Sequence, residues 1–163
     1  MPNWWNQIGV PHKGLVLNEV IDIREDGQSA EETPYETCMM CGNEKIRFVH
    51  IVSHNEVEEE YRVGCVCAER MTNDYINPKG KENELRNRAN RRNTWIKKTW
   101  KLSKTGNIYL NHKEHHIVIF KDKSQRYKVI IDDIFGKKTF QELHKAKIAA
   151  FNGIEYFKEI GKW

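Results

Sequence analysis

The sequence lacks the motifs that mark the common nucleotide-binding and hydrolase sites. Its 163 residues contain no Walker-type loop, no G-x-G-x-x-G fingerprint and no G-x-S-x-G elbow, so nucleotide hydrolysis and ordinary hydrolase chemistry have no support. The run at residues 112–116 reads H-K-E-H-H rather than the H-E-x-x-H of zinc proteases, whose two ligands share one helical face. We therefore expect surface histidines there, and a protein that is not an enzyme.

Long hydrophobic runs are also missing. No stretch of the sequence is long and apolar enough to cross a bilayer. The first residues show neither the basic region nor the apolar core of a secretory signal, so we expect a cytoplasmic protein with no membrane partner. A reducing cytoplasm disfavours structural disulfides.

Cysteine is scarce, but the four cysteines are clustered as Cys38 with Cys41 and Cys65 with Cys67. Two thiolate pairs can close one tetrahedral zinc site, and four sulfur ligands leave no open position for a catalytic water. Gly42 follows the first pair, where a metal-binding turn needs a residue free to take positive φ. A disulfide, a redox-active C-x-x-C, an iron–sulfur cluster and four unconnected thiols are the competing interpretations. We predict a structural Zn²⁺ bound by all four cysteines.

The residues around the cysteines predict a hairpin between two ligand pairs. Residues 46–52 and 59–63 have the composition of strands, joined by a polar stretch. Residues 68–74 then favour a short helix that would place Cys67 near its N-terminus, where the helix dipole favours a thiolate. The second pair is spaced C-x-C rather than C-x-x-C, so the ligand set stays open, and His50 or His54 could replace one sulfur.

The segment at roughly residues 36–75 resembles the treble-clef class of zinc fingers, because it combines C-x-x-C-G, a hairpin and a ligand pair at the start of a helix. The chain is also similar to bacterial and phage proteins that carry C-x-x-C-G followed by V-G-C-x-C-A, a resemblance that implies no particular activity. Treble-clef nucleases place a catalytic histidine in the hairpin. His54 beside Asn55 leaves a metal-dependent nuclease as an alternative, although the following helix offers only Asn73 as a matching residue.

Charge divides the chain into two electrostatically opposite parts. Residues 1–78 carry fourteen Asp and Glu against six Lys and Arg, whereas the whole chain has a net charge of +4. The Pro- and Gly-containing stretch at 77–80 indicates a junction. We expect an acidic zinc-binding module at 1–77 with its core at 36–75, a basic linker helix at 78–98, and a third part at 99–163.

The linker helix combines basic and aromatic residues. Nine basic residues and two acidic ones lie between Lys79 and Lys101, a composition that suits phosphate contact. Part of this surface could instead face the acidic N-terminal half. Trp95 and Trp100 are expected in the core of the following domain. The residues of the linker helix expected to contact nucleic acid are Arg86, Arg88, Arg91, Arg92, Lys97 and Lys98.

Beyond the linker, the sequence predicts an antiparallel sheet of three to four strands followed by one packing helix, and hence an α+β fold. The expected strands cover residues 100–103, 108–110, 116–120 and 127–131. Thr139 and Glu142 have the spacing of a capping box and predict a helix that starts at Thr139. Its apolar stripe, wide enough to pack on the sheet, comprises Leu143, Ala146, Ala150, Ile154 and Phe157.

This order of elements, with the G-x-x-T-F-x-x-x-x-x-A-K-x-A-A-F phrase at 136–151, resembles the small DNA-binding modules of the AP2 and integrase arm-binding type. The same architecture also occurs in pure interaction modules. The resemblance implies that the exposed sheet face contacts nucleic acid, DNA rather than RNA, through alternating side chains. The residues it assigns to this role are Lys101, Tyr109, Arg126 and Lys128.

Taken together, these patterns predict a non-catalytic, zinc-containing nucleic-acid-binding protein. The first alternative is an adaptor or inhibitor of the phage–host or toxin–antitoxin type, whose acidic zinc module binds a basic protein. Trp4, Trp5 and Trp163 would be contact residues for such a partner, or would pack on the core. The second alternative is the treble-clef nuclease.

Overall fold

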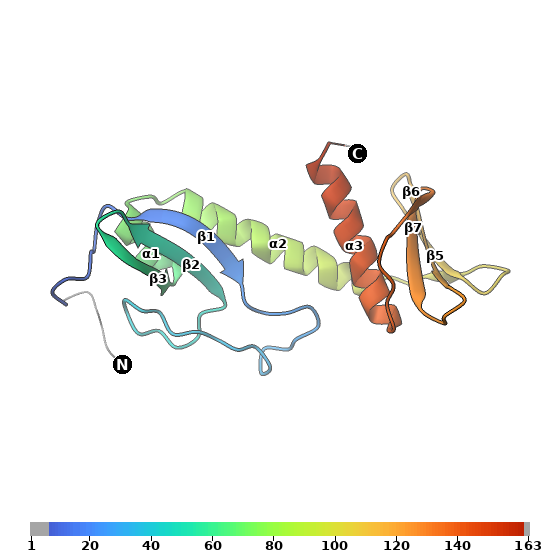
Figure 1. Cartoon of the computed structure of the whole chain (residues 1–163), viewed down its shortest axis with the longest axis horizontal. Coiled ribbons are helices and arrows are strands. Elements are labelled where there is room, and N and C mark those ends of the chain that lie inside the picture. The colour runs from blue at the N-terminus through green and yellow to red at the C-terminus, as the bar shows by residue number, and fades with distance from the viewer. Residues whose placement is uncertain (1–6, 162–163) are drawn as a thin grey trace. The chain divides into compact units, whose positions relative to one another are not determined.

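The computed structural model describes residues 7–161 and shows an α+β fold with two antiparallel sheets and three helices in that part of the chain (Figure 1). Trp4, Trp5 and Trp163 lie outside the described residues. The chain divides into two compact units, Met1–Ala89 and Asn90–Trp163. No helix within 7–161 is both long and apolar enough to span a bilayer.

The division falls inside helix α2 (Asn77–Lys97), which corresponds to the expected linker helix. The sequence placed the junction earlier, at residues 77–80. The start of α2 belongs to the first unit because its side chains and backbone contact β2 (Phe48–His54): the Pro78 carbonyl lies 3.2 Å from His50 Nε2, and the Arg86 guanidinium lies 4.7 Å from the centre of the Phe48 ring.

The first unit contains a three-stranded sheet covered by a short helix. Strand β2 lies between β1 (Val16–Asp22) and β3 (Val57–Val63), and α1 (Cys65–Thr72) follows β3 and packs on β2 and β1. The hairpin predicted between the cysteine pairs is confirmed as β2 and β3. Strand β1 was not predicted. It pairs with β2 over its whole length and makes β2 a central strand.

The second unit contains a five-stranded meander, one strand more than the largest number predicted. Its order is β4 (Lys101–Leu102), β5 (Ile108–His112), β6 (His115–Lys121), β7 (Tyr127–Ile131) and β8 (Ile134–Phe135). The additional strand β8 follows a tight turn. Asp132 and Asp133 both have positive φ there, 47° and 67°, as two-residue hairpin turns require.

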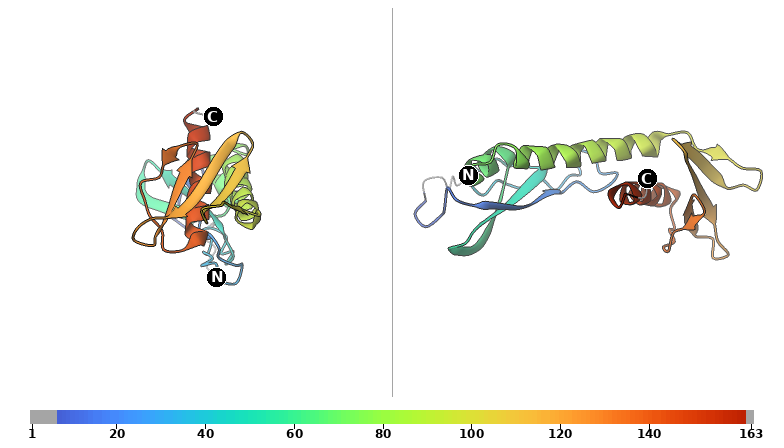
Figure 2. Two further views of the ribbon diagram at one scale, coloured as in Figure 1. Left: turned by 90° about the vertical axis from the view of Figure 1, so that its right-hand side faces the viewer. Right: turned by 90° about the horizontal axis from the view of Figure 1, so that it is seen from above.

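Helix α3 (Leu143–Glu159) lies along one side of this sheet, as both views of Figure 2 show. The predicted apolar stripe is confirmed. Ala146, Ala150 and Ile154 are buried, and Leu143 and Phe157 are partly buried against the same cluster. The helix and the sheet approach closely at Gly153, where a Cβ atom would lie 2.8 Å from Ile131 Cδ1.

The predicted capping box is wrong. The Thr139 hydroxyl accepts a hydrogen bond from Arg126 Nε at 2.7 Å and is not used to cap a helix. The backbone of Phe140 exchanges two hydrogen bonds with Tyr127, which keeps this segment extended beside β7. Helix α3 therefore starts one residue after Glu142, whose side chain makes no capping hydrogen bond.

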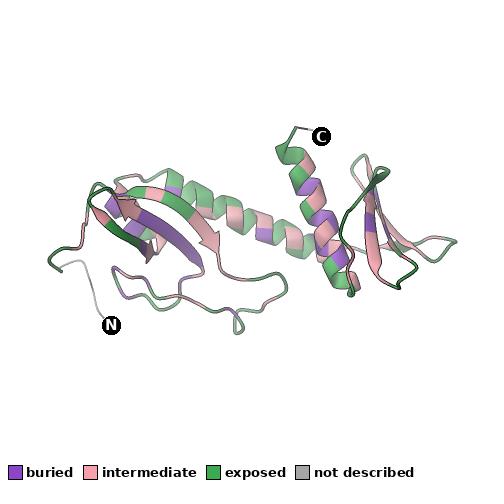
Figure 3. Cartoon of the chain, viewed as in Figure 1, coloured by how far each residue is buried: buried purple, intermediate pink, exposed green. Residues whose placement is uncertain are grey.

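Each unit has its own hydrophobic core. Figure 3 shows buried residues along β2, where Val49 and Val52 are almost fully enclosed. In the second unit Trp95 is buried, and its indole Nε1 donates a hydrogen bond to the Lys147 carbonyl at 2.9 Å. Trp100 packs against the same cluster. The assignment of both tryptophans to the core of the C-terminal unit is confirmed.

Candidate metal centre and sheet surface

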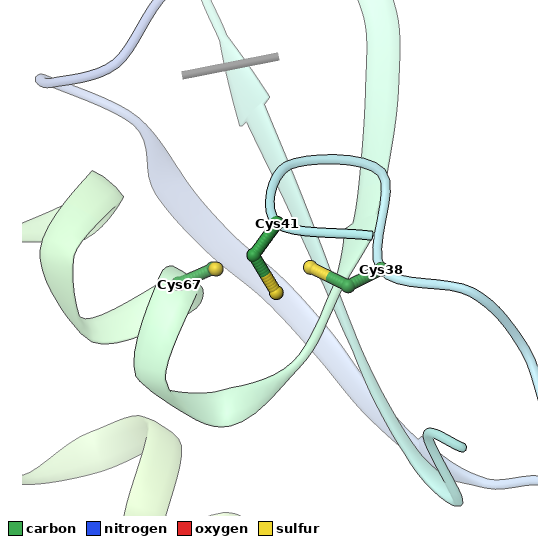
Figure 4. A group of neighbouring side chains, drawn as sticks. All are labelled: Cys38, Cys41 and Cys67. Carbon is green, nitrogen blue, oxygen red and sulfur yellow. The ribbon is translucent and has the colours of Figure 1, made fainter. Parts of the chain in front are cut away.

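Three of the four cysteines meet in the first unit. The Sγ atoms of Cys38, Cys41 and Cys67 lie within 4.8 Å of one another, and Figure 4 shows the three side chains pointing toward a common centre. Cys38 and Cys67 are buried and Cys41 is exposed. The cluster could hold a metal ion, and its cysteines come from the loop before β2 and from the first turn of α1.

The loop that presents Cys38 and Cys41 is closed by its backbone. Glu36 and Ile46 exchange two backbone hydrogen bonds at 3.1 and 3.0 Å, which brings the two ends of the loop together. Within it, the Gly42 N–H donates to the Cys38 carbonyl at 3.0 Å, and Gly42 has a φ of 79°. Glycine adopts this left-handed conformation without the steric cost that a Cβ atom brings. The predicted role of Gly42 is therefore confirmed.

Hydrogen bonding prepares Cys38 to act as a thiolate. A hydrogen bond from the Cys67 thiol lowers the pKa of Cys38 to about 4, against the opposing effect of burial. Backbone N–H groups contribute to the same shift, including that of Gly64, 3.5 Å from Cys38 Sγ. The same interaction raises the pKa of Cys67, which retains the proton of the pair. The thiolate is the form that binds metals.

Cys65, the fourth predicted ligand, does not join the cluster. Residues i and i+2 of a helix point about 200° apart, because each residue turns the chain by about 100°. Cys65 and Cys67 both belong to α1, so the C-x-C spacing sends their side chains to opposite faces. Cys65 Sγ lies 3.5 Å from Glu69 Oε1. Burial, followed by the charges of Glu82 and Glu69, raises the pKa of Cys65 to about 12.

Neither histidine of the hairpin replaces the missing sulfur. Among the described residues, the cluster around Cys38 contains only cysteines. His54 Nδ1 accepts a hydrogen bond from the Glu56 N–H at 3.1 Å. His50 is fully buried, and its two ring nitrogens lie 3.2 Å from the carbonyl oxygens of Phe48 and Pro78.

The basic side chains of α2 are largely engaged within the protein. Arg86 pairs with Glu82 at 3.3 Å. Arg91 forms two hydrogen bonds with the carboxylate of Glu155, at 3.2 and 2.9 Å. Lys98 Nζ lies 3.1 Å from His112 Nδ1. The remaining predicted residues of this helix are Arg88 and Arg92, which also interact within the protein, and Lys97, which is exposed.

The second sheet has one face that no other described element of its unit covers. Helix α3 packs on the face that carries Ile117, Ile119 and Ile131. Residues directly opposite one another on paired strands share a face. The strand register therefore aligns one row on the other side of the sheet, which we call the outer face: Lys101, Tyr109, Val118, Ile130 and Phe135.

Aromatic and basic side chains flank this row on the same face. His116 lies 5.5 Å from Tyr109 and Phe120 lies 6.5 Å from Phe135, measured between ring centres. Lys128 is opposite Phe120. Three of the four sheet residues expected to contact nucleic acid, Lys101, Tyr109 and Lys128, therefore lie on the outer face. The fourth, Arg126, is held by the hydroxyl and carbonyl of Thr139.

The apolar members of the outer face were missed from sequence. Residues 117–120 and 129–131 are continuous apolar runs, and such runs are typical of strands with apolar side chains on both faces. This signal, read together with the single packing helix, would have identified Val118, Phe120 and Ile130.

The fold and the site define an α+β protein with a three-cysteine cluster that could bind a metal ion. Comparisons of the chain with family models, with curated proteins and with solved structures found no match.

Proposed function

We propose that this is a non-catalytic nucleic-acid-binding protein in which a structural Zn²⁺ stabilises the first unit. The outer face of the second sheet is the proposed binding surface. The observation that carries the proposal is the combination of rings and lysines on a sheet face that no other described element of its unit covers.

Zinc is the metal that best suits the cysteine cluster. Thiolates select soft or borderline ions, and tetrahedral zinc sites in loops and helix starts use them as their main ligands. The succession of a closed loop at 36–46, the β2–β3 hairpin and α1 agrees with a treble-clef arrangement. Metal binding would tie the loop to the helix and so contribute directly to the folding of this unit.

Charge and ring content support nucleic acid as the ligand of the second unit. Residues 90–163 contain seventeen Lys and Arg against seven Asp and Glu, and such an excess attracts phosphates. Tyr109, His116, Phe120 and Phe135 place flat rings on the outer face. Stacking of a base on an aromatic ring contributes about 1–3 kcal/mol.

The rings favour single strands over duplex. Bases in a duplex are stacked on one another, whereas unpaired bases can be placed flat against protein rings. DNA rather than RNA remains the expectation from the resemblance to small DNA-binding modules. The proposed order of affinity is therefore single-stranded DNA, then RNA, then duplex DNA.

Fluorescence anisotropy of zinc-loaded protein with the three labelled nucleic acids, over a series of salt concentrations, tests this proposal. Phe135→Ala should weaken single-strand binding by roughly 5- to 100-fold. Tyr75→Ala removes another exposed aromatic ring, in the first unit, and should leave affinity unchanged. Lys128→Ala should reduce the slope of log K against log salt by about one, whereas Lys13→Ala, which removes an exposed lysine of the first unit, should not.

Weak binding to all three nucleic acids, with no dependence on salt, would overturn the proposal and favour the adaptor or inhibitor. In that case the acidic first unit would contact a basic protein. The nuclease alternative has less support, because the helix that follows the hairpin offers only Asn73 as a matching residue. It predicts metal-dependent cleavage that disappears in His54→Ala.

A further inference from the structure

A second group of metal-binding side chains lies apart from the cysteine cluster. Donor atoms of His50, Cys65 and Glu82 lie within 4.8 Å of one another. The three residues come from β2, α1 and α2, all within the first unit. Imidazole nitrogen, thiolate sulfur and carboxylate oxygen are the donor types that zinc uses in proteins.

The imidazole of His50 is in an environment that suits a metal ligand. The side chain is fully buried, and each ring nitrogen lies 3.2 Å from a carbonyl oxygen, Nδ1 from Phe48 and Nε2 from Pro78. A neutral imidazole has only one N–H to donate, so its other nitrogen directs a lone pair toward an acceptor. A cation at that nitrogen would relieve this repulsion, and metal-bound histidines commonly donate their other N–H to a backbone carbonyl.

Negative charge gathers around Cys65. Glu69 Oε1 lies 3.5 Å from its sulfur, and the largely buried carboxylate of Glu82 contributes a second negative charge nearby. Arg86 holds Glu82 Oε2 at 3.3 Å, which orients this carboxylate. Two carboxylates beside a cysteine sulfur form a negatively charged environment that favours a divalent cation.

Two members of the group are also accessible from solvent. A surface hollow of about 400 Å³ is lined by Cys65 and Glu82, together with Phe48 and Arg86. It offers a path by which an ion could reach the donors, a condition that a metal site must meet.

We propose that His50, Cys65 and Glu82 form a second Zn²⁺ site, separate from the cluster of Cys38, Cys41 and Cys67. The C-x-C spacing then has a physical explanation, because Cys65 and Cys67 lie on opposite faces of α1 and each binds a different ion. The second ion would join the central strand β2 to the starts of α1 and α2. This inference does not depend on nucleic-acid binding.

Zinc content per chain, measured by mass spectrometry on the purified full-length protein, tests the second site. We expect two zinc ions in the unaltered protein and one in Cys65→Ser and in Glu82→Gln. Glu84→Gln, which changes an exposed carboxylate on the same helix, should retain two. Glu82→Gln keeps the size of the side chain and one acceptor oxygen, so it remains informative if Cys65→Ser fails to fold.

Cobalt substitution distinguishes the two sites by their sulfur ligands. The intensity of the ultraviolet thiolate-to-cobalt band should fall by a smaller amount in Cys65→Ser, which removes the site with one sulfur. It should fall by a larger amount in Cys67→Ser, which disrupts the site with three sulfurs. A single zinc ion that is lost in Cys67→Ser but retained in Cys65→Ser would overturn the proposal. A single ion lost in both variants would also overturn it, because that result would show one site that requires both Cys65 and Cys67.

Discussion

Two adjacent isoleucines in β7 provide a direct test of the two-faced sheet. Ile131 is 6% exposed and packs beneath α3, whereas Ile130 is half-buried on the outer face. Truncation of Ile131 to alanine removes about three buried carbons, worth about 2.4 kcal/mol at about 0.8 kcal/mol each. The cavity left behind adds to this, so we expect a loss of about 3 kcal/mol.

The matched variant Ile130→Ala removes the same atoms from a surface that is already partly hydrated. We expect a loss of about 1 kcal/mol, from partial burial and reduced strand propensity. The difference of about 2 kcal/mol corresponds to a factor of about 30 in the equilibrium between folded and unfolded forms.

Hydrogen exchange detected by mass spectrometry suits this comparison, because it reports the opening free energy of each segment separately. Peptides from β6 and α3 should exchange much faster in Ile131→Ala than in Ile130→Ala. Peptides from the first unit, such as β2, should be unaffected by either change. Equal losses in the two variants would show that the outer face is covered, and would remove the basis for the nucleic-acid proposal.

Two further predictions concern ion pairs. Arg62 binds both oxygens of Glu36 at 2.7 Å and lowers the pKa of this carboxyl below its ordinary value of 4.5. The stabilisation by this ion pair is therefore present above pH 4.5 and is lost as pH falls through the lower folded-state pKa. Glu36→Gln should be less stable than the unaltered protein at neutral pH. In urea unfolding, the difference in stability between the two proteins should disappear at acidic pH. Arg91→Ala leaves the buried carboxylate of Glu155 without its bidentate partner and should lower the free energy of unfolding by about 1–3 kcal/mol. The double variant Arg91→Ala with Glu155→Gln should recover part of this loss. Thermal unfolding that shows no recovery would contradict this explanation.

Patterns that depend on local periodicity predicted the structure well. Ala146, Ala150 and Ile154 recur at four-residue steps, and a helix with that spacing can bury them on one side only. The hairpin between the cysteine pairs was equally clear, because two segments with the composition of strands flanked a polar turn. Such features are decided within a short segment and are therefore visible in the sequence.

Features that depend on distant partners were not predictable in the same way. Thr139 and Glu142 satisfy the spacing of a capping box, but Arg126 binds the Thr139 hydroxyl and the adjacent backbone pairs with Tyr127. Strand β1 is defined by its pairing with β2, more than twenty residues later in the chain. A tertiary contact outweighs a local preference of about 1 kcal/mol, and the sequence does not show which contact will form.

The prediction of the metal site assumed that all four cysteines bind one ion. The geometry of α1 allows only Cys67 of the second pair to join Cys38 and Cys41. Two residues separated by two or three others share a helical face, whereas residues at i and i+2 do not. This geometry was implicit in the C-x-C spacing and in the helix predicted beside it. What the sequence could not supply was Glu82, because only the folding of α2 against β2 brings this carboxylate to Cys65 and His50.

The outer face has a composition that folding alone does not explain. An antiparallel sheet with one solvated face normally alternates apolar and polar residues, yet Val118, Ile130 and Phe135 are directed away from the core cluster beneath α3. Apolar groups that stay partly in water contribute less to stability than buried ones and favour aggregation. The proposed function accounts for this composition, because a bound nucleic acid would cover the apolar groups and the lysines beside them would attract its phosphates. Polar replacements on this face should therefore leave the fold intact while abolishing the proposed binding of nucleic acid.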